Sequence, residues 1–375
     1  MRIFPNLGRF RVALDSLATL SCRGADRYFQ SDAEQHSGVD PRPDSELSDA
    51  GFSILQELLV PASAQTGPER RAMVPARVVV CQNSIMTWAS HRSGVLVFLL
   101  FTFGLSSIFY FLIIKSGHVG GGGGSYAAGL MWCPGVAALL TCKYLGRGID
   151  SLGWRWGKAR YQAACYLIPL GYAIVTYGFV WLTKFGGVPN REFVDGATKD
   201  FGLGAMPAWA SIALSFLFTA TTGVIADCAT TLGEEIGWRG FLVPELAKRY
   251  SFAGTAVISG VVWAVWHFPI LLFADYHAPT PTWYYLPIFV LTLPAISFVW
   301  TWMRLRSGSL WTGVILHASH NTFMQQFFQP LTIDNTRTRY VGGEFGAALL
   351  GVAILLAAYF WTRRGELKGT VDVIR

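Results

Sequence analysis

Long apolar runs are the feature that most limits how this chain folds. Eight of them are long enough to cross a bilayer as helices, which takes roughly 17 to 25 residues. They are Gly94 to Ile114, Tyr126 to Cys142, Ala163 to Thr183, Pro207 to Ala226, Phe252 to Phe273, Trp283 to Met303, Ser309 to Phe328 and Phe345 to Trp361. With 52% hydrophobic and 14% charged residues, the 375-residue chain has too little polar surface for a soluble globule. The sequence therefore predicts an all-α polytopic membrane protein with about eight transmembrane helices.

Lysine and arginine are concentrated in alternate loops. The loop after the second run has one acid, Asp150, against five bases, which are Lys143, Arg147, Arg155, Lys158 and Arg160. Such an excess is typical of cytoplasmic loops, whereas the segment Lys184 to Asp200 is balanced. We therefore expect an integral multi-pass protein of the plasma (inner) membrane with both termini in the cytoplasm. This bias and contact with anionic lipid headgroups explain the net charge of +7 without a nucleic-acid partner.

Residues 1–90 differ in composition from the rest of the chain. They are rich in Asp, Ser, Pro and Ala between Asp26 and Ala64 and lack sustained helical periodicity. The composition predicts either disorder or a mis-assigned N-terminal extension, because Met86 lies just before the first apolar run. A basic targeting presequence at the extreme N-terminus is the alternative. Residues 91–368 are then the membrane domain.

Three short clusters place costly polar groups inside or beside the apolar segments. They are Glu234 to Arg239, Trp263 to His267, and His317 to Asn321. Ionisable groups within a membrane are expensive to bury and usually functional. The clusters are therefore the candidate site.

Helical spacing separates the roles of the two adjacent carboxylates. Glu235 and Arg239 are four residues apart, so an ion pair between them would neutralise both charges. Glu234 is rotated by about 100° around the helix and is free to face another group. His317 and Asn321 also lie one turn apart on one helix face, and His267 comes from a different helix.

Together, Glu234, His267, His317 and Asn321 form the inventory of a hydrolytic site. A carboxylate can deprotonate a water, while neutral imidazoles and an amide oxygen hold a divalent metal or orient that water. His267, His317 and Asn321 are the predicted metal ligands, and their types suit zinc. Counted along the helices, the three clusters lie at depths that predict a cavity opening to the cytoplasm. We expect His320 to pack or to support this cavity.

The three motifs resemble those of the CPBP family of intramembrane metalloproteases. The matching patterns are Glu-Glu-x-x-x-Arg at 234–239, aromatic-x-x-x-His at 263–267 and His-x-x-x-Asn at 317–321, all within a CPBP-like core at 207–328. The family contains CAAX prenyl endopeptidases and bacteriocin-processing or immunity (Abi-type) proteins. The resemblance implies a metallo-endopeptidase in which Glu234 activates water, His267, His317 and Asn321 bind a metal or the water, and Arg239 supports Glu235. Trp263 stands where the family usually has phenylalanine.

Two other functions use the same residues differently. A non-proteolytic membrane scaffold or bacteriocin-immunity protein would use the same fold to bind a partner, and its function would survive Glu234→Gln. An ion-coupled transporter would also bury Glu and His, but the sequence has no visible internal repeat. The endopeptidase hypothesis predicts a membrane-associated peptide or protein as the substrate.

Overall fold

The computed structural model describes residues 76–202 and 206–367, with side chains from residue 94 onward. Among them, residues 86–202 and 206–367 belong to one compact unit. The predicted disorder of residues 1–75 lies outside the described residues. The first described helix begins at Ala76, within the range 1–90 for which the composition predicted no order.

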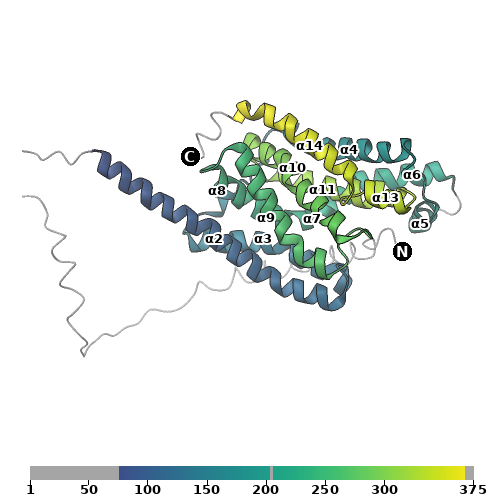
Figure 1. The fold of residues 1–375 in the computed structure, drawn as a ribbon, viewed down its shortest axis with the longest axis horizontal. Coiled ribbons are helices and arrows are strands. Elements are labelled where there is room, and N and C mark those ends of the chain that lie inside the picture. The colour runs from purple at the N-terminus through teal and green to yellow at the C-terminus, as the bar shows by residue number, and fades with distance from the viewer. Residues whose placement is uncertain (1–75, 203–205, 368–375) are drawn as a thin grey trace, which may run out of the picture. The chain divides into compact units, whose positions relative to one another are not determined.

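The described residues form helices and connecting turns, apart from an isolated bridge between Gly187 and Ile333. In chain order the elements are α2 (Ala76–Ser116), η1 (Gly121–Gly124), α3 (Ser125–Tyr144), η2 (Ile149–Leu152), α4 (Ala159–Leu182), α5 (Arg191–Phe201), α6 (Ala208–Phe218), η3 (Thr219–Gly223), α7 (Val224–Glu235), η4 (Ile236–Leu242), α8 (Val243–Ala247), α9 (Phe252–Phe273), α10 (Thr282–Ser307), α11 (Trp311–His320), η5 (Asn321–Phe328), α12 (Gln329–Leu331), α13 (Thr336–Val341), α14 (Ala347–Thr362) and η6 (Arg363–Leu367) (Figure 1). The predicted all-α fold is confirmed.

Seven helical segments of the described chain are long and apolar enough to cross a membrane. Six of them agree closely with predicted runs, and Phe252–Phe273 agrees at both ends. The fourth was predicted too short, because it continues past Ala226 to Ala247 and thus contains the first polar cluster. The eighth predicted run, Ser309 to Phe328, is helical as α11 and η5 but is less apolar than the other seven, since η5 contains Asn321, Thr322, Gln325 and Gln326.

Small residues allow these helices to pack closely. Helix α9 lies along α10, α10 along α14, and α7 contacts both α3 and α11 (Figure 1). A Cβ atom added at Gly260 of α9 would lie 2.4 Å from the Pro294 Cα atom of α10, and one at Gly135 of α3 would lie 2.5 Å from the Gly233 carbonyl oxygen of α7. Glycine at such contacts is typical of helix packing in membranes.

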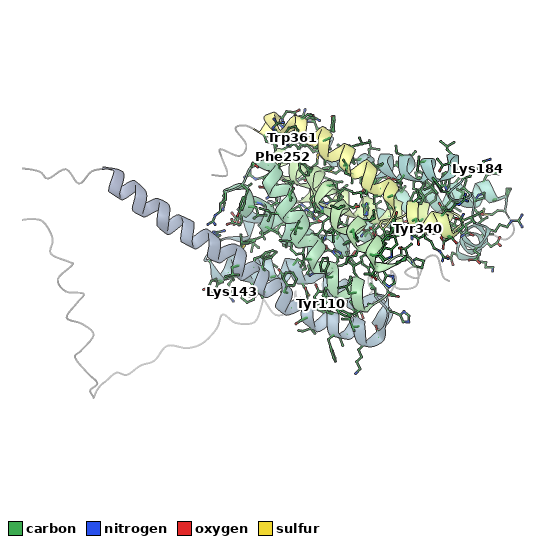
Figure 2. The ribbon with its side chains drawn as sticks, in the orientation of Figure 1. Tyr110, Lys143, Lys184, Phe252, Tyr340 and Trp361 are labelled. Atoms are coloured by element: carbon green, nitrogen blue, oxygen red, sulfur yellow. The ribbon has the colours of Figure 1, made fainter. Side chains whose placement is uncertain are left out.

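The basic loop after α3 and the balanced segment after α4 lie at opposite ends of this unit. Figure 2 shows Lys143, Phe252 and Trp361 towards one end, and Lys184 and Tyr340 towards the other. Lys143 begins the basic loop that the charge distribution predicts to be cytoplasmic, and Lys184 begins the balanced segment. The ends of α3 and α4 that these two lysines mark therefore lie on opposite sides of the unit.

Two π-helical segments lie directly at the polar clusters. Segment η4 begins one residue after Glu235, and η5 begins at Asn321. A π-helical turn is wider than an α-helical one and is frequent at functional sites. These segments mark the same region of the bundle as the sequence motifs.

Candidate active site

Glu235 is the buried centre of a hydrogen-bonded triad with Arg239 and His317. Its side chain is fully buried, and its Oε1 atom accepts hydrogen bonds from Arg239 Nη1 at 2.7 Å and from His317 Nδ1 at 3.0 Å. The Arg239 guanidinium is also buried and lies over the ring of Trp263, 4.3 Å from its centroid. The ion pair predicted from the spacing is present. Its contact with His317 links two motifs that are far apart in the sequence.

Glu234 points away from this triad and has different partners. Its Oε2 atom accepts hydrogen bonds from the indole N–H groups of Trp238, at 3.1 Å, and Trp263, at 2.8 Å. Its Oε1 atom makes no hydrogen bond to any described residue. The residue is only 2% exposed. The two adjacent carboxylates are therefore separated: Glu235 is bonded to the Arg239 guanidinium and the His317 imidazole, whereas Glu234 is held by two indole N–H groups.

In both predicted histidines, His267 and His317, the Nδ1 atom forms a hydrogen bond. His267 Nδ1 lies 2.8 Å from the Trp263 carbonyl oxygen, to which it donates, and His317 Nδ1 donates to Glu235. In the neutral form of either imidazole, the Nε2 atom then carries the lone pair. Histidines that bind metals or water commonly have this support from a carbonyl or carboxylate on the other nitrogen.

One cavity brings three of the four predicted catalytic residues together. Its polar lining includes His267, His317 and Asn321. The rest of the lining is largely apolar and comes mainly from α10. Glu234 is not in the lining itself but is bonded to the lining residue Trp263. His320 also lines this cavity, as the sequence suggested.

The donor set fits a weakly held divalent metal or a water molecule. Among the described residues, no group of three or more His, Cys, Asp or Glu side chains is placed to hold a metal ion. A metal at this site would therefore need the Asn321 amide oxygen beside the two imidazoles. The free Nε2 atoms and the nearby carboxylate of Glu234 are compatible with that arrangement.

A second polar network at the cavity was not predicted from the sequence. Glu344, in the segment before α14, accepts hydrogen bonds from His320 Nε2 at 2.7 Å, Gln325 Nε2 at 2.8 Å and the Tyr276 hydroxyl at 3.0 Å. Burial raises the pKa of Glu344, but these hydrogen bonds outweigh it and lower the pKa below its usual value. On the far side of His320, Nδ1 contacts the Tyr172 hydroxyl at 2.5 Å. In the sequence, the only indication of such a role is that Glu344 directly precedes the last apolar run.

The fold and the site together define a polytopic membrane protein with a buried carboxylate, imidazole and amide centre. Residues 207–323 match the family described as type II CAAX prenyl endopeptidase Rce1-like. A relative, the CAAX prenyl protease 2 of Methanococcus maripaludis, is 33% identical over 89 residues, which are 22% of this chain and 32% of the relative. The chain thus matches about a third of that relative's length. Both findings confirm the resemblance of this region to the CAAX protease family.

Proposed function

We propose that this protein is an intramembrane endopeptidase of the CAAX protease and bacteriocin-processing type. The observation that carries the proposal is the separation of the two adjacent carboxylates. Glu235 is committed to Arg239 and His317, while Glu234 keeps one oxygen free of hydrogen bonds to the described residues. A general base needs such an unpaired oxygen beside the reacting water.

In the proposed reaction Glu234 removes a proton from a water molecule. The water oxygen bonds to the carbonyl carbon of the peptide, and the C–N bond then breaks. The proton passes from Glu234 to the leaving amine, so that the products are a carboxylic acid, which then ionises, and an amine. The indole N–H groups of Trp238 and Trp263 fix the Glu234 carboxylate during both transfers.

The same water molecule would be held, on the side away from Glu234, by His267, His317 and Asn321. Their free imidazole nitrogens and amide oxygen would also hold a divalent metal, with zinc suited by ligand type. A bound zinc ion would supply Lewis acidity and a water of lowered pKa. Glu235 acts here through His317, because its hydrogen bond to Nδ1 fixes the tautomer and the ring.

The proposed substrate is a membrane-associated peptide or protein that is cleaved near the cytoplasmic surface. The apolar lining of the cavity supports a substrate that arrives from the lipid phase. The relative's name makes a prenylated peptide ending in a CAAX sequence the first probe to use. A set of unprenylated, lipid-tethered peptides is the second probe.

The test compares purified full-length variants in lipid vesicles on both probes. Glu234→Gln and His317→Ala should each lower kcat by roughly 10²- to 10⁴-fold, the usual contribution of a general acid–base group. The matched control is Glu192→Gln, which neutralises a carboxylate in the first turn of α5, outside the candidate membrane spans. Unchanged cleavage in both site variants would refute the assignment. A wild type that cleaves neither probe would favour the scaffold function.

The metal is tested separately from the peptidase reaction. Metal analysis of the purified protein should show about one divalent ion per chain, and His267→Ala and His317→Ala should each reduce that amount. Chelation should abolish cleavage, and adding zinc back should restore it. Full activity in a metal-free preparation would show that the two histidines bind water alone.

A further inference from the structure

We propose that Glu344 is a positioning residue of this site, which orients Asn321 through Gln325 and His267 through Tyr276. The inference rests on the proposed function and adds a residue that lies outside all three motifs. Its side chain is 13% exposed and reaches the cavity that His267, His317 and Asn321 also line.

The first path runs from Glu344 through the side-chain amide of Gln325 to that of Asn321. An ionised carboxylate only accepts hydrogen bonds, so Gln325 must turn its amino group towards Glu344, 2.8 Å away. The same amino group lies 3.4 Å from Asn321 Oδ1. It therefore determines which end of the Asn321 amide is the oxygen, and leaves the second lone pair of that oxygen for a water or a metal.

The second path reaches the other side of the cavity. The Tyr276 hydroxyl donates to Glu344 Oε2 at 3.0 Å. The ring of Tyr276 stacks on the imidazole of His267, with centroids 5.7 Å apart and planes 22° from parallel. Glu344 thus holds the Tyr276 ring against the face of the His267 imidazole. The Trp263 carbonyl oxygen accepts the hydrogen bond from His267 Nδ1.

The third partner of Glu344 anchors the carboxylate. His320 donates from Nε2, and its Nδ1 contacts the buried Tyr172 hydroxyl. This arm leads away from the proposed catalytic groups to α4. It offers a control, since Tyr172→Phe changes the same network and leaves both paths from Glu344 to the catalytic residues intact.

The kinetic test uses the full-length protein in vesicles and whichever peptide probe the wild type cleaves. Glu344→Leu should lower kcat at least tenfold with KM changed by less than about twofold, because geometry at the reacting atoms is lost while the apolar cavity remains. Glu344→Gln keeps one acceptor oxygen and should restore part of the activity. Tyr172→Phe should stay within about twofold of the wild type.

Coupling separates positioning from a general structural effect. Because Glu344 acts on Asn321 through Gln325, the variant Gln325→Leu should cost much less in the Glu344→Leu background than alone. Fully additive losses, a change confined to KM, or an unchanged kcat in Glu344→Leu would overturn the proposal.

A second measurement does not depend on cleavage. In nitrogen-15 NMR spectra of histidine-labelled protein, Glu344→Leu and Tyr276→Phe should shift the His267 ring signals, identified by their loss in His267→Gln, and Tyr172→Phe should leave them in place. Unshifted signals in both site variants would overturn the inference even for an inactive protein. A wild type that cleaves no probe but shows these shifts would refute the proposed function and retain the positioning role.

Discussion

At the scale of single residues, the site depends on how a fully buried carboxylate is neutralised. Glu235 has one cation and one imidazole on the same oxygen, and its second oxygen, Oε2, is buried without a hydrogen-bond partner among the described residues. Arg239 has its guanidinium over Trp263 and Trp300. Removing either charge of such a pair leaves the other uncompensated.

We therefore expect Glu235→Ala to destabilise the protein by about 3–5 kcal/mol, the usual cost of breaking a buried ion pair. Glu234→Gln should have a much smaller effect on stability, because the amide oxygen still accepts from Trp238 and Trp263. Thermal unfolding in detergent would measure both. If the two variants unfold at the same temperature, the division of roles between the carboxylates is wrong.

Gly313 gives a second test of the Glu235 geometry. A Cβ atom at this position of α11 would lie 2.3 Å from Glu235 Oε2 and 3.3 Å from Arg239 Cγ. Gly313→Ala should therefore displace the Glu235 carboxylate and weaken its hydrogen bond to His317. Peptidase activity should then fall at least tenfold. Gly351→Ala in α14, where an added Cβ would meet nothing within 4 Å, is the control and should retain activity.

At the scale of the helices, apolar length predicted most of the fold. Phe252–Phe273 agrees at both ends because no charge interrupts it. The segment through Ala247 was cut short at Ala226 because Asp227 follows, and hydropathy further counts Glu234, Glu235 and Arg239 as three separate costs. Their hydrogen bonds to each other or to neighbouring indoles remove much of that cost, and only the folded chain reveals these partners.

The candidate site was likewise predictable only where its contacts are local in the sequence. Spacing along one helix gives the Glu235–Arg239 pair, which is local. Glu344 was missed because its partners, Tyr276, His320 and Gln325, lie on other elements and form no sequence pattern with it. The hydrogen bond between Glu235 and His317 is equally non-local.

The Arg304 side chain of α10 stabilises the π-helical turn of η4. Arg304 Nε donates to the Arg239 carbonyl oxygen at 2.7 Å, and its Nη2 lies 3.3 Å from the Leu152 carbonyl oxygen. The side chain is buried, and no carboxylate of the described chain forms a salt bridge with it. Its role is thus to satisfy backbone carbonyls beside the Glu235–Arg239 ion pair.

Arg304→Gln should leave the Arg239 carbonyl without its donor and destabilise the protein by about 1–3 kcal/mol, the cost of an unsatisfied buried group. Activity should fall with it, because the carbonyl belongs to the residue that pairs with Glu235. Arg155→Gln, which changes an exposed arginine, should have neither effect. An Arg304→Gln protein as stable as the wild type would show that the turn holds without this contact.

At the scale of the whole molecule, the remaining question is which end of the helical unit faces the cytoplasm. Lys143 and Lys184 lie at opposite ends in Figure 2, at the C-terminal ends of α3 and α4. The basic loop after α3 predicts that Lys143 is cytoplasmic and Lys184 external. The same assignment determines whether the proposed peptidase receives its substrate from inside the cell.

Single cysteines introduced at these two lysines, in a background without native cysteines, would test the orientation. Lys184→Cys should react with a membrane-impermeant maleimide in intact cells, whereas Lys143→Cys should react only after the membrane is opened. Both positions adjoin helix ends at the membrane surface, so that a difference in labelling reports the side and not the depth. The reverse pattern would place the basic loops outside and would require a substrate supplied from the external face.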